Sequence, residues 1–470
     1  MFIHRHPDLQ LLLHRYVSCP VRPVWLPSGG CIPLMVSEYI LELSIYLKTY
    51  SYAHEPGKLL VYSTARGAIV KLDSSVLADA RDQKLSDQEQ ALLAKIGILV
   101  PDRLAEQEQM RTLFEEGNRR SRQFTALVTM NLDCNLACGY CYEDHFRGKR
   151  YMTPETADLL VQYVSAQIER GLDVTLDFYG GEALLSLTMM KDIAARVRHK
   201  ASEAGTQASF NLVSNATLLT REVAQELKEL GFVSVRFTID GPPDVHNLQR
   251  PFISGKGSFD RIIENLDQTC DILSVQLGGN YTRDNYRKFP LLLDLLTERG
   301  ITADRLGSVL FSPVTPKAGE AGLSDFSSGC ACPNDPWLIE ASLFLRHEIL
   351  RRGFTTPKPK LVACMVEFDN DLVISYDGSL YKCPAFMGWE DMRIGTLADG
   401  TNDYRVSHRL DIWKNDECLN CPYLPLCFGG CRFLRRVRTG EIDGVDCRRE
   451  YLDAALEQIL LQDLTLRKRP

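Results

Sequence analysis

The sequence predicts an α/β protein in three parts: a partial (β/α)6 TIM-like barrel, a small winged-helix-like unit before it and a cysteine-rich domain after it. Three observations support this. Short apolar segments alternate with amphipathic segments between about residues 124 and 315, as in a parallel sheet wound by right-handed crossovers. A predicted strand pair with helices precedes this region. Seven of the 15 cysteines follow it, between about residues 360 and 450.

The composition describes a globular chain of several domains. Its 470 residues exceed one ordinary core, and 45% of them are hydrophobic. The formal net charge of -7 argues against a nucleic-acid partner. Because no apolar run is long enough to cross a bilayer and no secretory signal opens the chain, we expect a cytoplasmic protein without a membrane partner. Grouped cysteines in that compartment are more often metal ligands than disulfides.

Residues 1–34 show no clear period, and we expect a tail or sequence upstream of a misassigned start codon. Met35 opens the first organised segment. Cys19 and Cys31 lie in this tail, and we assign them no role.

Residues 35–105 are predicted to form a peptide-recognition unit. The segment Lys58–Asp73 predicts two strands joined at Ala65-Arg66-Gly67, and Ser86-Asp87-Gln88-Glu89 predicts a capped helix start. A hairpin with helices is a winged-helix pattern. A charged connector, Asp102–Arg122, is expected to separate this unit from the next region.

The middle region, residues 124–315, predicts six strands separated by helices. Its first helix begins at Thr153, an N-cap that is followed by Pro154 in the first turn. The chemistry of such a fold lies at the C-terminal ends of the strands. The predicted strands are Phe124–Met130, Val174–Phe178, Phe210–Val213, Val233–Ile239, Val275–Thr282 and Leu306–Phe311.

The rest of the chain divides into three segments. Residues 316–359 connect the middle region to the cysteine-rich domain and contain Cys330 and Cys332. The cysteine-rich domain covers residues 360–450. A helix from Arg449 to about Leu466 closes the chain, and residues 451–470 form the last segment.

Three cysteines, Cys134, Cys138 and Cys141, follow the first predicted strand of the middle region. The Cys-x3-Cys-x2-Cys spacing lets one short loop bind three irons of a [4Fe-4S] cube. The fourth iron then has no protein ligand and can hold a substrate or cofactor. Structural or zinc-binding cysteines are the alternative interpretation.

With this motif, residues 124–450 resemble the radical S-adenosylmethionine (SAM) superfamily. The resemblance implies that the open iron binds SAM. It also implies that reductive cleavage of SAM yields a 5'-deoxyadenosyl radical, which abstracts a substrate hydrogen. An electron donor such as flavodoxin or ferredoxin is then required.

Further motifs imply SAM contacts by the same resemblance. Gly180-Gly181-Glu182 resembles the family's Gly-Gly-Glu motif, whose acid can pair with the SAM ammonium. The stretch "LVSNATLL" departs from the family's Thr-Asn-Gly-Thr pattern at Ser214 and Ala216, so a backbone conformation that requires Gly is in doubt there. The implied SAM-binding residues are Tyr140, Gly180, Gly181, Glu182, Ser214, Asn215, Thr238 and Asp240 near the ribose, and Arg250 toward the carboxylate.

Each of these motifs also has a structural interpretation. Gly-Gly and Asp-Gly-Pro are common in turns and loops. We expect His246 to be a hydrogen-bonded structural residue rather than a catalyst. No catalytic residue is assigned.

The C-terminal cysteines resemble the SPASM domain, which marks radical SAM enzymes that modify peptides or proteins. The resemblance implies two auxiliary [4Fe-4S] clusters, three clusters in all, with zinc as the alternative. The ligands of one auxiliary cluster are Cys418, Cys421, Cys427 and Cys447, and most ligands of the other are Cys364, Cys383 and Cys431. Its fourth ligand is Cys330 or Cys332, or the site stays open for a peptide cysteine, which we prefer.

The function implied is that of a radical SAM/SPASM maturase that cross-links a ribosomally synthesised precursor peptide, with a thioether as one candidate bond. The geopeptide-type maturases match best. One alternative is a sulfatase-maturing protein modifier, which typically has Asp where this chain has Pro384 after Cys383. The other is a zinc-stabilised binding protein without catalysis.

Overall fold

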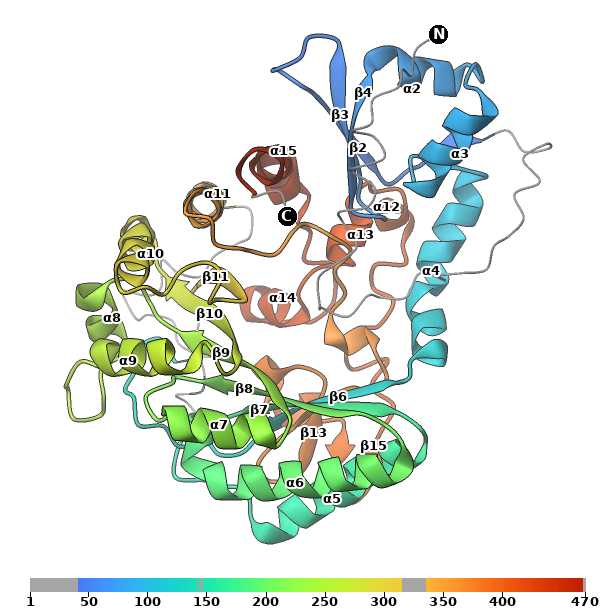
Figure 1. The fold of residues 1–470 in the computed structure, drawn as a ribbon. Helices are drawn as coiled ribbons and strands as arrows, with labels where there is room; N and C mark the ends of the chain where they lie inside the picture. The colour runs from blue at the N-terminus through green and yellow to red at the C-terminus, as the bar shows by residue number, and fades with distance from the viewer. Residues whose placement is uncertain (1–40, 142, 144–146, 315–334, 468–470) are drawn as a thin grey trace.

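A computed structural model describes residues 41–141, 143, 147–314 and 335–467 (Figure 1). Its main feature is a ten-stranded sheet in the order β11-β10-β9-β8-β7-β6-β12-β13-β14-β15. The expected tail at residues 1–34, and Cys330 and Cys332, lie outside the described residues.

All six strands predicted for the middle region are present, and they are parallel. The predicted N-cap is confirmed, because the Thr153 side chain accepts a hydrogen bond from the Thr156 amide. The strands are β6 (Gln123–Thr129), β7 (Asp173–Tyr179), β8 (Ala208–Ser214), β9 (Phe232–Thr238), β10 (Ser274–Tyr281) and β11 (Ser308–Pro313). The helices are α5 (Pro154–Glu169), α6 (Leu187–Ala204), α7 (Arg221–Glu229), α8 (Pro243–Gln249), α9 (Phe259–Thr269), α10 (Phe289–Glu298) and α11 (Pro336–Arg351).

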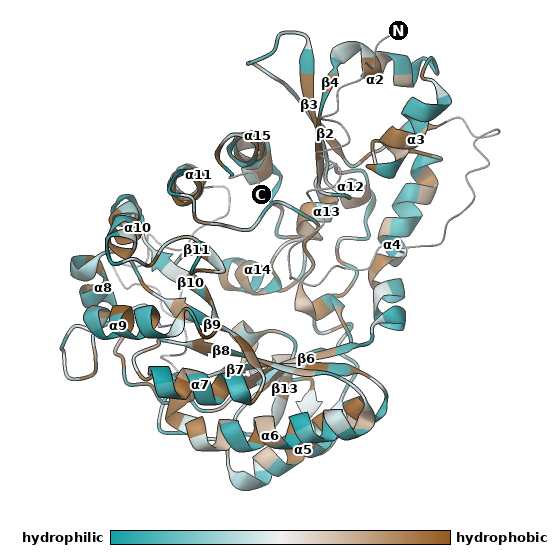
Figure 2. Ribbon diagram, viewed as in Figure 1, coloured by the Kyte–Doolittle hydropathy of each residue, from teal (hydrophilic) through white to brown (hydrophobic). Residues whose placement is uncertain are grey.

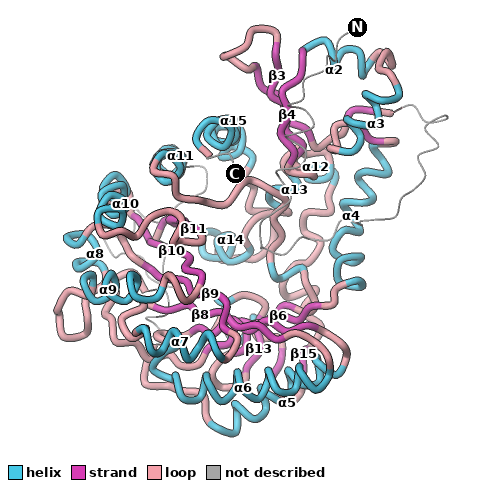
Figure 3. The backbone as a smooth tube through the Cα atoms, in the orientation of Figure 1, coloured by secondary structure: helices cyan, strands magenta, loops and turns pink. Residues whose placement is uncertain are grey.

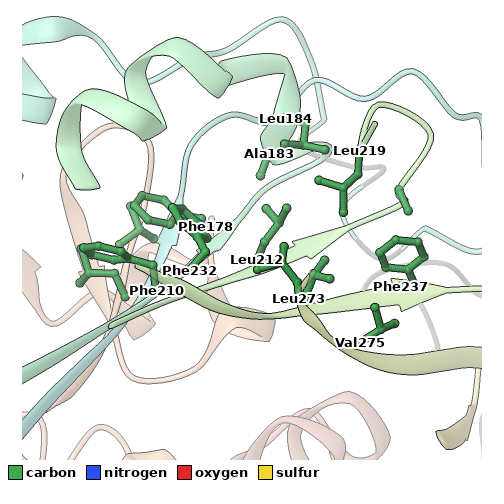
Figure 4. Packing of buried hydrophobic residues seen from close by; sticks show 14 of the residues in the cluster. Phe178, Ala183, Leu184, Phe210, Leu212, Leu219, Phe232, Phe237, Leu273 and Val275 are labelled. Carbon is green, nitrogen blue, oxygen red and sulfur yellow. The ribbon is translucent and has the colours of Figure 1, made fainter. Parts of the chain in front are cut away.

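The two faces of these strands differ in chemistry. One face is apolar and packs against the helices, as Phe178, Phe210 and Phe232 show in Figure 4. The helices α5, α6 and α7 mix apolar and polar residues in the way of amphipathic helices (Figure 2). The opposite face, called the inner face below, carries half-exposed polar residues such as Asp177 and Asn211. Its polar, accessible character contrasts with the packed apolar interior of a closed (β/α)8 barrel.

The N-terminal unit contains the predicted hairpin. Strands β2 (Leu47–Ser51), β3 (Lys58–Ser63) and β4 (Ala68–Asp73) form an antiparallel sheet, while β1 (Glu42–Leu43) pairs with β5 (Leu99–Val100). The predicted capped helix is also confirmed, since Ser86 and Glu89 form a reciprocal capping box. The helices are α2 (Ser74–Arg81) and α3 (Asp87–Lys95).

The segment expected to be a charged connector forms the helix α4 (Arg103–Arg120) instead. Asp102 caps it by accepting from the amides of Leu104 and Ala105 at 3.0 and 3.2 Å. Met110, Leu113 and Phe114 are buried at helical spacing against the cysteine-rich region. Three apolar residues in a charged sequence therefore suffice to anchor the helix.

The cysteine-rich region continues the main sheet. Strand β12 (Asp371–Ile374) pairs in parallel with β6, so that Thr125 lies opposite Asp371. The rest of this region is largely loop (Figure 3). Its other elements are β13 (Ser379–Tyr381), β14 (Gly395–Thr396), β15 (Gly400–Thr401), α12 (Asp416–Leu419), α13 (Leu424–Cys427), α14 (Arg432–Thr439) and the predicted closing helix α15 (Arg449–Leu466). None of the helices in the described part of the chain combines the length and hydrophobicity that a membrane crossing requires.

Candidate functional site

The loop after β6 holds Cys134, Cys138 and Cys141, each partly buried at the C-terminal ends of the strands. The Cys134 sulfur accepts from the Leu136 amide at 3.4 Å and from the Asn215 side chain at 3.6 Å. Burial raises the pKa of Cys134 to about 11 and that of Cys141 to about 12. These thiols would become thiolates only beside a strong positive charge, such as that of bound iron.

Gly180 and Gly181, at the end of β7, hold this loop in place. The Gly181 amide donates to the Asn131 carbonyl at 3.1 Å. A Cβ atom on Gly181 would lie 2.4 Å from the Asp133 carbonyl oxygen, and one on Gly180 would lie 2.6 Å from that of Asn131. The two glycines thus permit a close approach between β7 and the backbone just before the first cysteine.

Glu182 links the ends of β7 and β8. Its buried carboxylate accepts from the Leu184 amide at 3.0 Å, the Ser214 hydroxyl at 2.8 Å and the Asn215 amide at 2.8 Å. Burial raises the pKa of this carboxyl. Three protein donors already contact it, so a SAM ammonium would meet a carboxylate that the protein itself largely satisfies.

The backbone after β8 keeps a left-handed conformation without glycine. Ala216 has φ of 67°, although a Cβ atom costs roughly 1–2 kcal/mol there. Its amide donates to Ser214 Oγ at 2.8 Å, and its carbonyl accepts from Asn265 Nδ2 at 2.7 Å. The departure from the family pattern at Ala216 therefore leaves the local conformation intact.

A second network gathers on the other side of the cysteine loop. The Tyr140 hydroxyl accepts from Arg250 Nη1 at 2.7 Å and from Asn280 Nδ2 at 3.0 Å, and it donates to Asp240. Asp240 is fully buried and also accepts from the Asn280 amide at 2.7 Å. The buried Nε of Arg250 has no hydrogen-bond partner among the described residues. A carboxylate such as that of SAM would supply the missing acceptor.

His246 supports this network rather than facing a ligand. It is fully buried, and burial lowers its pKa to about 3. Nδ1 accepts from the Asp240 amide at 3.1 Å, so Nε2 carries the proton and donates to Ser258 Oγ at 2.9 Å. Ser258 in turn donates to the Arg250 carbonyl at 2.6 Å. The structural interpretation of His246 fits these contacts.

The seven C-terminal cysteines lie in two groups. In the first, burial raises the pKa of Cys383 to about 12, and the nearby thiols Cys364 and Cys431 raise it further. In the second, burial raises the pKa of Cys418, to which Cys421 and Cys447 add. Burial also raises the pKa of Cys427, and the nearby thiols Cys421 and Cys418 raise it further. Within each of the two implied sets, these cysteines therefore lie near enough to raise one another's pKa.

The polar surroundings of the first group are tightly built. Arg432 and Glu367 form a buried ion pair beside Cys431. The fully buried Lys382, next to Cys383, donates to the carbonyls of Phe368 and Asp371. An iron–sulfur cube binds each thiolate through a different iron, so its ligands need not meet at one point. In the described ranges no three His, Cys, Asp or Glu side chains meet closely enough to hold a single metal ion.

Sequence reasoning missed Asn280, which joins Tyr140 and Asp240. It lies near the end of β10, and a polar residue at a strand end was the available signal. Thr238, a predicted SAM contact, is the last residue of β9, two positions before Asp240. The remaining predicted SAM contacts divide between the Glu182 and Tyr140 networks.

Comparisons with known proteins agree with this geometry. Residues 128–281 match the model of the radical SAM superfamily. The chain is 31% identical over 176 residues to the Fe-coproporphyrin III synthase of Methanosarcina barkeri, which covers 37% of this chain but only 40% of that protein. It is 24% identical over 336 residues to a cysteine-type anaerobic sulfatase-maturating enzyme of Clostridium perfringens, covering 64% of this chain and 86% of that protein.

Among solved structures, native anSMEcpe with bound AdoMet and Cp18Cys peptide has a similar fold. The TM-score is 0.55 at 19% identity, over 72% of this chain and 99% of the other. The family match begins within β6 and includes the cysteine loop, Glu182 and the Tyr140 network. The chain is an enzyme that contains a radical SAM domain, matched over residues 128–281.

Proposed function

We propose that this enzyme cleaves SAM reductively and uses the resulting radical to cross-link a ribosomally synthesised precursor peptide. The observation that carries this proposal is the sorting of ten cysteines into a three-cysteine loop beside β6 and two further groups. The similarity to a sulfatase-maturating enzyme, which acts on a protein, supports a peptide substrate.

Cys134, Cys138 and Cys141 would hold the SAM-binding cluster. When bound, the cluster and SAM would supply the electron transfer and the 5'-deoxyadenosyl radical. The protein would orient SAM through Arg250 and the Glu182 network, and an external flavodoxin or ferredoxin would deliver the electron. Cys418, Cys421, Cys427 and Cys447 would hold one auxiliary cluster, and Cys364, Cys383 and Cys431 most of another.

The first auxiliary site would stay open to a cysteine of the substrate. Support comes from the Glu367–Asp371 segment, where sulfatase-type relatives carry an additional cysteine: the Arg432 ion pair and the Lys382 contacts occupy it here. A substrate thiol bound to iron would be kept as a thiolate, which suits thioether formation. A Cys330→Ser, Cys332→Ser double variant should keep the spectrum of this cluster. Loss or conversion of the cluster would favour ligation by one of those cysteines.

The N-terminal unit would bind the leader part of the precursor by strand addition. One face of its sheet packs on α2 and α3 and the other on α15, so the outer strands β2 and β4 remain for pairing. Replacing residues of β2 or β4 with proline should weaken precursor binding more than SAM cleavage. Equal affinity in such variants would favour a unit that merely packs against the rest of the protein.

A sulfatase-maturing activity is the second candidate, because the C. perfringens relative covers 64% of this chain. One residue argues against a sulfatase-maturing activity: Pro384 follows Cys383, whereas sulfatase-maturing enzymes typically have Asp at this position. The deciding experiment is mass spectrometry of a candidate precursor co-expressed anaerobically with the enzyme. A loss of 2 Da per cross-link is expected: the 5'-deoxyadenosyl radical would take one hydrogen atom, and the second would leave as a proton while its electron passes to an auxiliary cluster. Anaerobic purification should also give a brown protein with iron and acid-labile sulfide, whereas a zinc-stabilised binding protein would give neither.

A further inference from the structure

Among the described residues, the cysteine-rich region covers one half of the inner face of the main sheet. On that half, Leu127 of β6 and Tyr179 of β7 pack into the same apolar cluster as Cys383 and Cys431. The Thr129 hydroxyl also contacts Met387 Sδ at 3.1 Å. The first group of C-terminal cysteines therefore lies against the inner face of β6 and β7.

The other half of the inner face, on β9, β10 and β11, is accessible. Arg236 lies opposite Gln276, and Gly278 lies opposite Leu310, so these four residues share one face. Arg236 is exposed, and Leu310 remains 50% exposed. Gly278 carries no side chain, which leaves room between them. This half of the face, called the wall below, is therefore accessible in the described part of the chain.

The wall lies below the Tyr140 network on the same strands. Arg236 precedes Asp240 by four residues, a rise of about 13 Å along an extended strand. Asn280, which binds Tyr140, is two residues beyond Gly278 and faces the same side. A substrate held on this wall would therefore extend from Arg236 toward the proposed SAM site.

In the part of the chain that the structure describes, the guanidinium of Arg236 has only a weak, neutral partner. Its hydrogen-bond partner is the neutral Gln276 Oε1 at 3.4 Å. Within the described ranges, no carboxylate forms an ion pair with it, and Asp177 on the same face instead accepts from Asn211 at 2.7 Å. A guanidinium offers five N–H donors in a planar fork that matches a carboxylate.

We propose that Arg236 is a specificity-determining residue that binds a carboxylate of the substrate peptide, either an Asp or Glu side chain or a free C-terminus. This proposal rests on the peptide-maturase function proposed above. It adds that the segment entering the site carries a negative charge a few residues from the modified position. The arginine acts on substrate choice and makes no contact with the reacting atoms.

Two sets of peptides test the proposal. The probes are acetylated and amidated Gly/Ser peptides with one Cys, carrying a single Asp at each other position in turn, together with their Asn counterparts. One Asn peptide also has a free C-terminal carboxylate, which distinguishes the two sources of charge. Affinity is measured by fluorescence anisotropy with the full-length protein, the Arg236→Gln and Arg236→Lys variants, and Arg221→Gln. Arg221 is a matched control, because it lies on α7 and bonds one neutral oxygen at 3.3 Å.

The parent should bind at least one carboxylate peptide about tenfold more tightly than its neutral counterpart. Arg236→Gln should lose this preference, Arg236→Lys should keep part of it, and Arg221→Gln should keep all of it. A parent without preference, or a preference retained in Arg236→Gln, would overturn the proposal. So would a fall in SAM affinity in Arg236→Gln, because Arg236 would then belong to the SAM site.

Formation of 5'-deoxyadenosine by the reduced parent enzyme distinguishes failure of the carboxylate contact from failure of the proposed function. If the parent forms it but shows no preference, the carboxylate contact fails and the proposed function stands. If the cluster-loaded parent forms none, the proposed function fails and the carboxylate contact fails with it.

Discussion

Two hydrogen-bond networks flank the cysteine loop, and they differ in what they leave unfilled. On the β7–β8 side, the Glu182 carboxylate accepts from three groups of the protein itself. On the β9–β10 side, Tyr140 connects Arg250, Asp240 and Asn280, yet the buried Arg250 Nε lacks a partner among the described residues. The Glu182 carboxylate is thus largely satisfied by the protein, whereas Arg250 Nε is a buried donor without a partner among the described residues.

The sequence motifs assign the same role, contact with SAM, to both networks, whereas the difference in their hydrogen bonds indicates two separate roles. Both Glu182 and Arg250 were expected to contact SAM. We infer that Glu182 acts mainly by fixing the ends of β7 and β8 around the loop, and that Arg250 acts mainly on the bound cofactor. The predictions below test that division.

The loop between the networks should show the largest effect. Cys138→Ala removes one of three proposed thiolate ligands, so 5'-deoxyadenosine formation under reducing conditions should fall at least about a hundredfold. The control is Cys270→Ala, which changes a buried thiol at the end of α9. The assignment fails if Cys138→Ala cleaves SAM at the parent rate.

Glu182→Gln should destabilise the fold itself. The amide NH2 group would face backbone and hydroxyl donors that now meet a carboxylate, and a buried unsatisfied group costs about 1–3 kcal/mol. We expect the apo protein to lose about 2–4 kcal/mol of unfolding free energy in urea, given the charged hydrogen bonds that are also lost. Ser214→Ala removes one neutral hydroxyl, which donates to Glu182 and accepts from the Ala216 amide, and it should cost about 1 kcal/mol for each of these bonds. Equal losses in the two variants would contradict the central role of Glu182.

Arg250→Lys should show the opposite pattern. A lysine keeps the charge but loses the planar fork, so SAM affinity should fall about tenfold or more. The unfolding free energy of the apo protein should fall by less than in Glu182→Gln, because the lysine keeps a positive charge beside Asp240 although the hydrogen bond from Arg250 Nη1 to Tyr140 is lost. Calorimetry of SAM binding and urea unfolding measure the two effects. A large stability loss with unchanged SAM affinity would reverse the roles that we assign.

The last prediction concerns the dependence of stability on pH. Burial lowers the pKa of His246 to about 3, so below the unfolded value of 6.5 the unfolded chain takes up a proton that the folded chain does not. Stability from this group is therefore present above pH 6.5 and is lost as pH falls, by up to about 1.4 kcal/mol per pH unit. His246→Asn should flatten the loss between pH 6.5 and 5 by about 2 kcal/mol. His408, with a pKa lowered to about 4, should maintain a residual slope. An unchanged slope in the variant would show that His246 is protonated in the folded protein.

Much of the fold was predictable because its signals are local. The six parallel strands follow from apolar runs, and Thr153 and Ser86 mark helix starts through their own side chains. The cysteine sets could be assigned from spacing by resemblance to a known family. These features depend on residues close together in the sequence.

The features that were missed depend on distant partners. The helix α4 has a charged sequence. Its three buried apolar residues pack against Trp413 and Phe428, which lie about 300 residues later in the chain, so the sequence around α4 does not reveal this contact. The Asn215 amide donates to Glu182, and the Asn280 amide donates to Asp240. Each of these hydrogen bonds joins the ends of two strands, and no single sequence motif contains both partners. The pairing of β12 with β6 likewise has no local signal, since β12 has only four residues.

That last pairing bears on how the enzyme is made. During synthesis β6 emerges long before β12, so one side of β6 stays an open strand edge until Asp371–Ile374 has been translated. Open edges promote pairing with other chains, which makes this interval the one most exposed to aggregation. The cysteine loop that follows β6 is therefore fully supported only after Asp371–Ile374 has been translated. Insertion of the SAM-binding cluster is best timed after β12 has closed that edge.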